Sequence, residues 1–245
     1  MKIACQTITF GSEKVKMDMH DIVKAVADAG YDGIETGVHR LDMNALEDYK
    51  SWLGEYNLKQ AGMHVGGNFS DTDAVKQQIE NVPEIIKVAH KLDCANIFFS
   101  GGPVPDYKIV AENLNKFGKA LRYGGVTLSY HNHDWEFKDG GFYILCEYTD
   151  PECVSFVPDI GWVTMGGANP VQVLKELGGR VSNLHFKDFT SEGGFTELGK
   201  GIVDFKPVYD FVKSRDIWLV AEQDASEIGA CESVRQNLKY IKSLA

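Results

Sequence analysis

The sequence predicts a single (β/α)8 barrel, an α/β fold in which eight parallel strands alternate with helices. Eight short apolar runs with strand-like composition recur about 30 residues apart, the length of one strand–helix–strand step. Stretches with helical periodicity separate the runs, and no Pro-rich or Ser-rich linker divides the 245 residues. We therefore expect one domain over residues 1–245, because barrels of this length form a single unit.

The expected strands are the apolar runs in chain order. They cover residues 3–8, 33–36, 60–65, 96–99, 126–133, 154–160, 181–186 and 218–222. A doubly wound parallel sheet would show the same alternation, but no glycine fingerprint follows the first run. The barrel is therefore the favoured architecture.

Helical periodicity and stop signals define the segments between the runs. Pro83 interrupts one long helical segment and predicts a kink or two helices there. Pro170 suits the first position of a helix, and Gly178 follows that helix as a stop. We expect helices over 18–29, 71–92, 171–177 and 225–245, and a short or irregular helix within 134–151.

Composition excludes several classes of partner. The 25 Lys and Arg residues against 35 Asp and Glu residues give a formal net charge of −10. Nucleic acids and anionic membrane surfaces attract basic proteins, so we expect neither as a partner. The sequence contains no run of about 18 apolar residues, the length that is needed to span a bilayer. Five scattered cysteines without a Cys-x-x-Cys pair predict thiols in a reducing cytoplasm. Barrels of this kind often form homodimers, but the assembly state is not readable from the sequence.

Four consecutive expected strands end in residues that bind metals. The active site of a (β/α)8 barrel lies at the C-terminal ends of its strands. The fifth to eighth runs end at or beside His131, Asp159, His185 and Glu222. Imidazole and carboxylate groups bind Mn²⁺, Co²⁺, Zn²⁺ and Mg²⁺, and two carboxylates balance the charge of such an ion. We therefore predict one divalent metal ion held by these four residues.

Each of these residues also has an ordinary structural explanation. A strand-end His is usually hydrogen-bonded, and an Asp two residues before a Gly usually forms a turn. Glu222 is harder to explain in this way, because an apolar strand rarely carries an unpaired carboxylate. The ligand from the fifth strand stays open among His131, His133 and Glu136, since the two histidines face the same side of a strand.

Catalytic and substrate-binding groups are expected around the metal. Glu222 or His133 would take a proton from the substrate. Lys187 shares a strand face with His185 and would hold a substrate oxygen or act as an acid, although a salt bridge to Asp188 or another carboxylate explains it equally well. Aromatic faces suit the C–H faces of sugar rings, although they also simply roof cavities. The expected substrate contacts are Trp135 and Trp162, with His64 and Glu35 near the pocket rim.

Longer motifs resemble a known superfamily over essentially the whole chain. These motifs are Tyr130-His131-Asn132-His133, Asp159-Ile160-Gly161, His185-Phe186-Lys187-Asp188, residues 199–205 and residues 218–224. They resemble the xylose-isomerase-like TIM barrels, the sugar phosphate isomerase/epimerase proteins, and the last three are most similar to inosose dehydratase-like members. Endonuclease IV also belongs there, but this acidic chain lacks its expanded His set.

The resemblance implies a metal held by Glu, Asp, His and Glu from strands five to eight. Asp159, His185 and Glu222 match that pattern, whereas His131 stands where many members have the first Glu. Members that epimerise ketoses use the two Glu residues as acid and base on opposite faces of the substrate. The departure at His131 puts that reaction in doubt and favours dehydration or a one-base isomerisation.

Three functions are consistent with these residues. The first is a divalent-metal-dependent sugar or keto-sugar isomerase or epimerase, which abstracts a proton next to a carbonyl through a metal-stabilised enediolate. The second is an inosose-type dehydratase, a lyase that shares this first step. The third is a non-catalytic sugar-binding barrel. In each case the partner is a small sugar or keto-polyol.

Overall fold

Strand and helix alternate along residues 1–11 and 17–245, the part of the chain that this computed structural model describes. Contacts between residues gather the chain into two units. Unit 1 comprises Met1–Ala61 and Asn183–Ala245, and unit 2 comprises Gly62–Ser182. The boundary falls inside strand β3 (Lys59–His64). The expectation of one domain over residues 1–245 stays a prediction.

Unit 1 is built around four hydrogen-bonded parallel strands. In spatial order these are β2 (Gly33–Gly37), β1 (Lys2–Gln6), β10 (Trp218–Ala221) and β7 (Asn183–Phe186). All five residues of β2 are buried, as is typical of a parallel strand that is covered on both faces. Burial on both faces explains why β2 lacks a strict alternation of apolar and polar residues.

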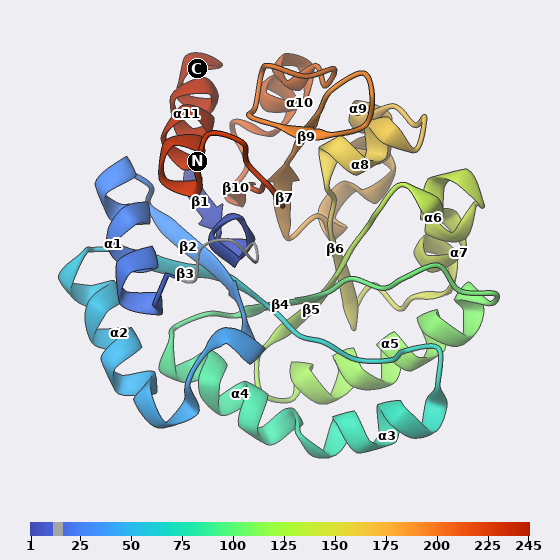
Figure 1. The fold of residues 1–245 in the computed structure, drawn as a ribbon. Coiled ribbons are helices and arrows are strands. Elements are labelled where there is room, and N and C mark those ends of the chain that lie inside the picture. The colour runs from blue at the N-terminus through green and yellow to red at the C-terminus, as the bar shows by residue number, and fades with distance from the viewer. Residues whose placement is uncertain (12–16) are drawn as a thin grey trace. The chain divides into compact units, whose positions relative to one another are not determined.

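Helices cover the strands of unit 1. They are α1 (Met19–Ala29), α2 (Leu46–Glu55), α10 (Phe205–Val212) and α11 (Ala230–Ser243). Asp18 caps α1 by accepting a hydrogen bond from the Asp21 N–H, and Gly30 ends it in a left-handed conformation. Figure 1 shows α1 and α11, from opposite ends of the chain, side by side. A short antiparallel hairpin, β8 (Asp188–Phe189) with β9 (Phe195–Thr196), follows β7.

Unit 2 holds the other parallel strands, in the order β3, β4 (Asn96–Phe99), β5 (Thr127–His131) and β6 (Val154–Val157). Phe156 of β6 forms a further parallel bridge to Val181, just before β7 begins. The helices between these strands are α3 (Thr72–Glu80), α4 (Val82–Lys91), α5 (Tyr107–Arg122), α6 (Trp135–Lys138), α7 (Gly141–Tyr148), α8 (Ile160–Met165) and α9 (Pro170–Leu177). In Figure 1, α3, α4 and α5 lie outside β4 and β5.

Several sequence-based expectations for unit 2 are confirmed. The segment 71–92 forms two helices, with Pro83 in the first turn of the second. Pro170 begins α9, and the segment 134–151 holds only the short helices α6 and α7.

Three expected strands were wrong at their C-terminal ends, and one hairpin was missed. The run 3–8 is strand only as far as Gln6, because a short 3-10 helix, η1 (Thr7–Gly11), begins at the next residue. The run 126–133 is strand only as far as His131, because the next residue, Asn132, turns to bind the backbone of Asp159. The run 154–160 is strand only as far as Val157, because Asp159 already caps helix α8. The β8–β9 hairpin was not expected, since each of its strands has only two residues.

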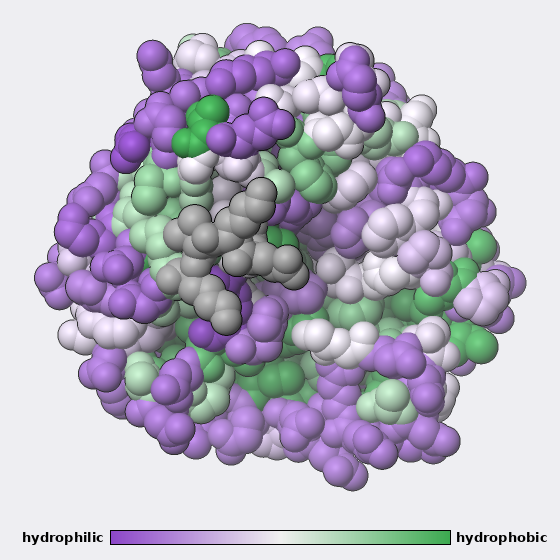
Figure 2. Space-filling view, in the orientation of Figure 1, coloured by the Kyte–Doolittle hydropathy of each residue, from purple (hydrophilic) through white to green (hydrophobic). Residues whose placement is uncertain are grey.

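The face of the molecule seen in Figure 2 is largely hydrophilic at its periphery, with hydrophobic residues between the polar ones. No helix in the described residues is long and apolar enough to cross a membrane. All five cysteines are free thiols, as expected. The cytoplasmic location and the homodimer stay predictions.

A buried carboxylate organises the loop that follows the hairpin in unit 1. Asp188 accepts hydrogen bonds from the backbone N–H groups of Phe189, Gly199, Gly201 and Val203, at 2.9–3.1 Å. A Cβ atom at Gly201 would overlap this carboxylate and the Phe189 carbonyl oxygen. The Gly-Lys-Gly segment therefore wraps closely around one buried side chain.

We expect Asp188→Ala to lower the free energy of unfolding by at least about 3 kcal/mol, because it leaves several buried N–H donors without acceptors. Urea denaturation measures this loss. Asp204→Ala is the matched control, since Asp204 caps only helix α10 and its removal should cost about 1 kcal/mol. Equal losses in the two variants would contradict the role given to Asp188.

Candidate functional site

His185 lies between two carboxylates in unit 1. Its Nδ1 is 2.6 Å from Glu222 Oε2, and its Nε2 is 2.9 Å from Glu35 Oε1. His185 and Glu35 are 0% exposed. They come from β7 and β2, and Glu222 directly follows β10. Burial disfavours the charged imidazole, but the charges of Glu35 and Glu222 outweigh it and raise the pKa of His185 to about 10.

Lys187 extends this ion-pair cluster. Its Nζ is 3.3 Å from Glu222 Oε1 and 3.0 Å from Asp224 Oδ2, and its side chain is 2% exposed. The ring of Phe195 lies 5.8 Å from the same ammonium. A lysine is rarely buried without a specific partner, and here it contacts the carboxylate that also contacts His185. The salt bridge expected for Lys187 is confirmed, with Glu222 and Asp224 as its partners, whereas its role in holding a substrate oxygen or acting as an acid stays a prediction.

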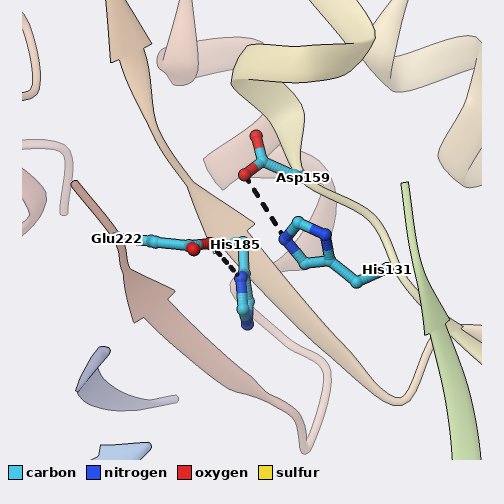
Figure 3. A group of neighbouring side chains, drawn as sticks. All are labelled: His131, Asp159, His185 and Glu222. Carbon is cyan, nitrogen blue, oxygen red and sulfur yellow. Dashed lines mark hydrogen bonds and ion pairs between the residues drawn. The ribbon is translucent and has the colours of Figure 1, made fainter. Parts of the chain in front are cut away.

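In unit 2, His131 contacts Asp159. The distance from His131 Nε2 to Asp159 Oδ2 is 3.5 Å, longer than an ordinary hydrogen bond, and both residues are buried. The other oxygen of Asp159 accepts from the Trp162 N–H and caps helix α8. Asn132 bonds both the N–H and the C=O of Asp159, and so fixes its backbone. Figure 3 shows both pairs, His131 with Asp159 and His185 with Glu222, each joined by a dashed line.

Glu136 is committed to other contacts. Its Oε1 accepts from the Tyr130 hydroxyl at 2.6 Å, and its Oε2 accepts from the His133 N–H at 2.7 Å. Burial raises the pKa of Glu136, although these hydrogen bonds oppose that shift. Of the three residues left open as the ligand from strand five, His131 is the one that faces Asp159. The geometry therefore favours His131 as the ligand from strand five. Glu136 instead accepts hydrogen bonds from the Tyr130 hydroxyl and the His133 N–H.

Aromatic rings gather beside this pair. The His133 ring stacks on Trp135, with centroids 4.1 Å apart and planes 14° apart, and the Trp162 ring lies 5.5 Å away. The His131 ring is 5.5 Å from that of His133. Trp135 begins helix α6, and Trp162 belongs to helix α8. Their predicted role as substrate contacts stays a prediction.

The two expected rim residues differ in position. His64 ends β3, where its Nε2 lies 3.1 Å from the Ser100 hydroxyl and its ring packs on Phe98. The rim position was wrong for Glu35, because β2 is buried along its full length and points this carboxylate at His185. Sequence reasoning also missed Asn132 and Asp188, although both lie inside the quoted motifs.

Each unit holds a buried histidine and a buried carboxylate of the kinds that can bind a divalent cation. His131 and His185 offer imidazole nitrogens, Asp159 and Glu222 offer carboxylate oxygens, and all four are buried. A ligand set that combines imidazole with carboxylate suits Mn²⁺, Co²⁺ and Zn²⁺, whereas Ca²⁺ is typically bound by oxygen ligands alone. In unit 1 the carboxylates of Glu35, Glu222 and Asp224 outnumber the positive charges of Lys187 and the imidazolium, which favours a bound cation.

The titration of His185 should appear in the stability of the metal-free protein. Its folded pKa, about 10, lies above the usual 6.5, so its contribution is full below pH 6.5 and is lost as the pH rises to 10. We expect the free energy of unfolding to fall across that window by up to about 1.4 kcal/mol per pH unit. Chemical denaturation with a chelator present measures this slope. The variant His185→Gln should lose this pH dependence. The control His39→Gln, at an exposed site, should keep it. The same pH dependence in the wild type and both variants would show that His185 is not its source.

Comparison with known proteins identifies relatives. A family model described as "Xylose isomerase-like TIM barrel" matches residues 23–244. Inosose dehydratase of Clostridium tetani is 29% identical over 164 residues, which is 57% of this chain and 55% of that enzyme. The chain thus spans about half the length of several curated relatives that it matches. Inosose dehydratase of Lactiplantibacillus plantarum is 25% identical over 265 residues, covering 92% of this chain and 88% of that enzyme.

Solved structures agree on the fold. The crystal structure of a sugar phosphate isomerase/epimerase from Parabacteroides distasonis superposes with a TM-score of 0.82 at 21% identity. That alignment covers 98% of this chain and 92% of the other. Together with the family match and the parallel strands of both units, this confirms the predicted (β/α)8 barrel.

Proposed function

The chain belongs to the xylose isomerase-like TIM barrel family, and we propose that it is a divalent-metal-dependent dehydratase of a keto-polyol of the inosose type. The observation that carries this proposal is the 3.3 Å contact between Lys187 and Glu222. In this contact an ammonium group that can act as an acid lies next to a carboxylate that can act as a base. Relatives named inosose dehydratase support the same choice.

We propose that His131, Asp159, His185 and Glu222 hold one ion together. In a barrel of this family the C-terminal ends of the strands carry the active site, and each of these residues stands at such an end. When bound, the ion acts as a Lewis acid on the carbonyl of the substrate and makes the neighbouring C–H group more acidic.

The acid–base work then belongs to Glu222 and Lys187. Glu222 takes the proton from the carbon next to the carbonyl, and the electron pair of that C–H bond forms a C=C bond. The C–O bond at the next carbon breaks, and the leaving hydroxyl takes a proton from Lys187 and departs as water. The 3.3 Å contact lets the proton on Glu222 pass to Lys187, so both groups return to their first state.

This arrangement suits elimination better than epimerisation. Base and acid lie together, so they act on one face of the substrate, whereas epimerisation needs a second group on the opposite face. His131 holds the strand-five position that a second carboxylate would occupy. The isomerase or epimerase reaction shares the first step and stays a prediction that the same assay can detect. The sugar-binding barrel without catalysis predicts binding alone.

The aromatic cluster of unit 2 supports a polyol ring as the substrate. Trp135 and Trp162 are suited to packing on C–H faces, and the Trp135 indole N–H is buried without a hydrogen-bond partner among the described residues. A substrate hydroxyl would satisfy such a donor. We infer an uncharged ring with several hydroxyls, as in an inosose.

The test incubates the purified protein with a keto-inositol and Mn²⁺ or Co²⁺ in D₂O and follows the products by NMR. A dehydratase releases an unsaturated ketone. Deuterium at the α-carbon without loss of water would indicate the isomerase or epimerase instead. Binding without exchange or turnover, with ketoses tried as well, would leave the non-catalytic barrel.

A further inference from the structure

Glu35 is a buried carboxylate that the proposed chemistry does not use. It belongs to β2, whose five residues are all buried, and it is 0% exposed. Burying a carboxylate without a partner is costly, so its contacts should account for its presence. Its Oε1 lies 2.9 Å from His185 Nε2 and also accepts from the Gln6 side-chain amide at 3.4 Å. The register of β1 and β2, which sets Gln6 opposite Glu35, produces the second contact.

The imidazole of His185 has two nitrogens, and they face different carboxylates. Nδ1 faces Glu222, which we assign to the metal, at 2.6 Å, and Nε2 faces Glu35 at 2.9 Å. A neutral imidazole that binds a cation through one nitrogen carries its proton on the other. With Nδ1 on the side of Glu222, the proton belongs on Nε2, toward Glu35.

We propose that Glu35 is a positioning residue that accepts the Nε2 proton of His185 and so turns the Nδ1 lone pair toward the cation. This inference rests on the proposed metal site. A carboxylate behind a ligating histidine fixes the orientation of the ring and makes the nitrogen on the metal side more basic. Glu35 acts only through His185 and needs no contact with the substrate, which agrees with its complete burial.

Two substitutions separate this role from simple packing. Glu35→Leu keeps the bulk and removes every acceptor, whereas Glu35→Gln keeps one acceptor oxygen but loses the charge. Gln60→Leu is the matched control, because Gln60 is another buried polar residue of unit 1 and its side-chain oxygen accepts from the Tyr49 hydroxyl. Circular dichroism of the metal-free proteins establishes that each variant is folded.

The first readout is metal affinity, measured by calorimetry with Mn²⁺, Co²⁺ or Zn²⁺ alone. We expect Glu35→Leu to weaken binding about 10- to 100-fold, Glu35→Gln to weaken it less, and Gln60→Leu to leave it unchanged. The second readout is the ¹H–¹⁵N spectrum of His185 in the Zn²⁺-loaded protein. The wild type should show the Nε2-protonated ring alone, and Glu35→Leu a mixture of ring forms.

Wild-type affinity and an unchanged His185 spectrum in Glu35→Leu would overturn the inference while leaving the metal site in place. An equal loss in Glu35→Leu, Glu35→Gln and Gln60→Leu would also overturn it, because a general packing defect would then be the cause. If the wild type binds none of the three ions, the metal site itself is refuted and the inference falls with it.

Discussion

Glu222→Gln is expected to slow α-proton exchange and turnover by at least about 10³-fold, the largest effect of any single substitution in the proposed site. The substitution removes the group that takes the proton. It also removes a carboxylate that contacts both His185 at 2.6 Å and Lys187 at 3.3 Å. Solvent deuterium incorporation into a keto-inositol, followed by NMR, measures this effect.

Glu55→Gln is the control for Glu222→Gln, since Glu55 is an exposed residue at the end of α2 in the same unit. Its exchange rate should equal that of the wild type. Near-normal exchange in Glu222→Gln would show that another group, such as His133, is the base. Because Glu222→Gln should also lose the metal, metal content is measured on the same samples, and Asp159→Asn shows how far exchange falls when the ion is lost but Glu222 remains.

Lys187→Arg is expected to separate the two steps of the reaction. Arginine keeps the positive charge beside Glu222 and Asp224 but does not release a proton in a protein. We expect elimination of water to slow by about 10²- to 10⁴-fold, with exchange of the α-proton retained within about tenfold. Product formation and deuterium incorporation, recorded in one NMR time course, give both rates.

Lys187→Met complements this experiment because it removes the charge as well. It leaves the carboxylates of Glu222 and Asp224 without this ammonium, so exchange should fall together with elimination. Elimination at the wild-type rate in Lys187→Arg would rule out Lys187 as the acid. The buried lysine would then serve only as a counter-ion in the cluster.

The positions of the proposed metal ligands at strand ends could be predicted from the sequence, because a (β/α)8 barrel carries its functional residues there. His131, Asp159, His185 and Glu222 are far apart in sequence, but each stands at or just after the end of a parallel strand. Apolar runs reveal such strands, and polar residues at their ends stand out. The strand-end argument therefore needs no knowledge of side-chain contacts.

The contacts between side chains could not be predicted in the same way. Glu35 looked like a rim residue, because a sequence shows that a strand carries a carboxylate but not which neighbour the carboxylate meets. Asn132 looked like part of a strand, but it leaves β5 to bind the Asp159 backbone. Asp188 looked like a salt-bridge partner for Lys187, but its oxygens accept four backbone N–H groups.

Metal stoichiometry tests the central claim most directly. Protein purified without chelator, loaded with Mn²⁺ or Co²⁺ and analysed by native mass spectrometry, should carry one ion per chain. Asp159→Asn removes a ligand of unit 2 and Glu222→Gln a ligand of unit 1, and each should abolish that occupancy. Loss in only one variant would contradict a site that draws on both pairs, and a wild type without metal would contradict the proposed reaction.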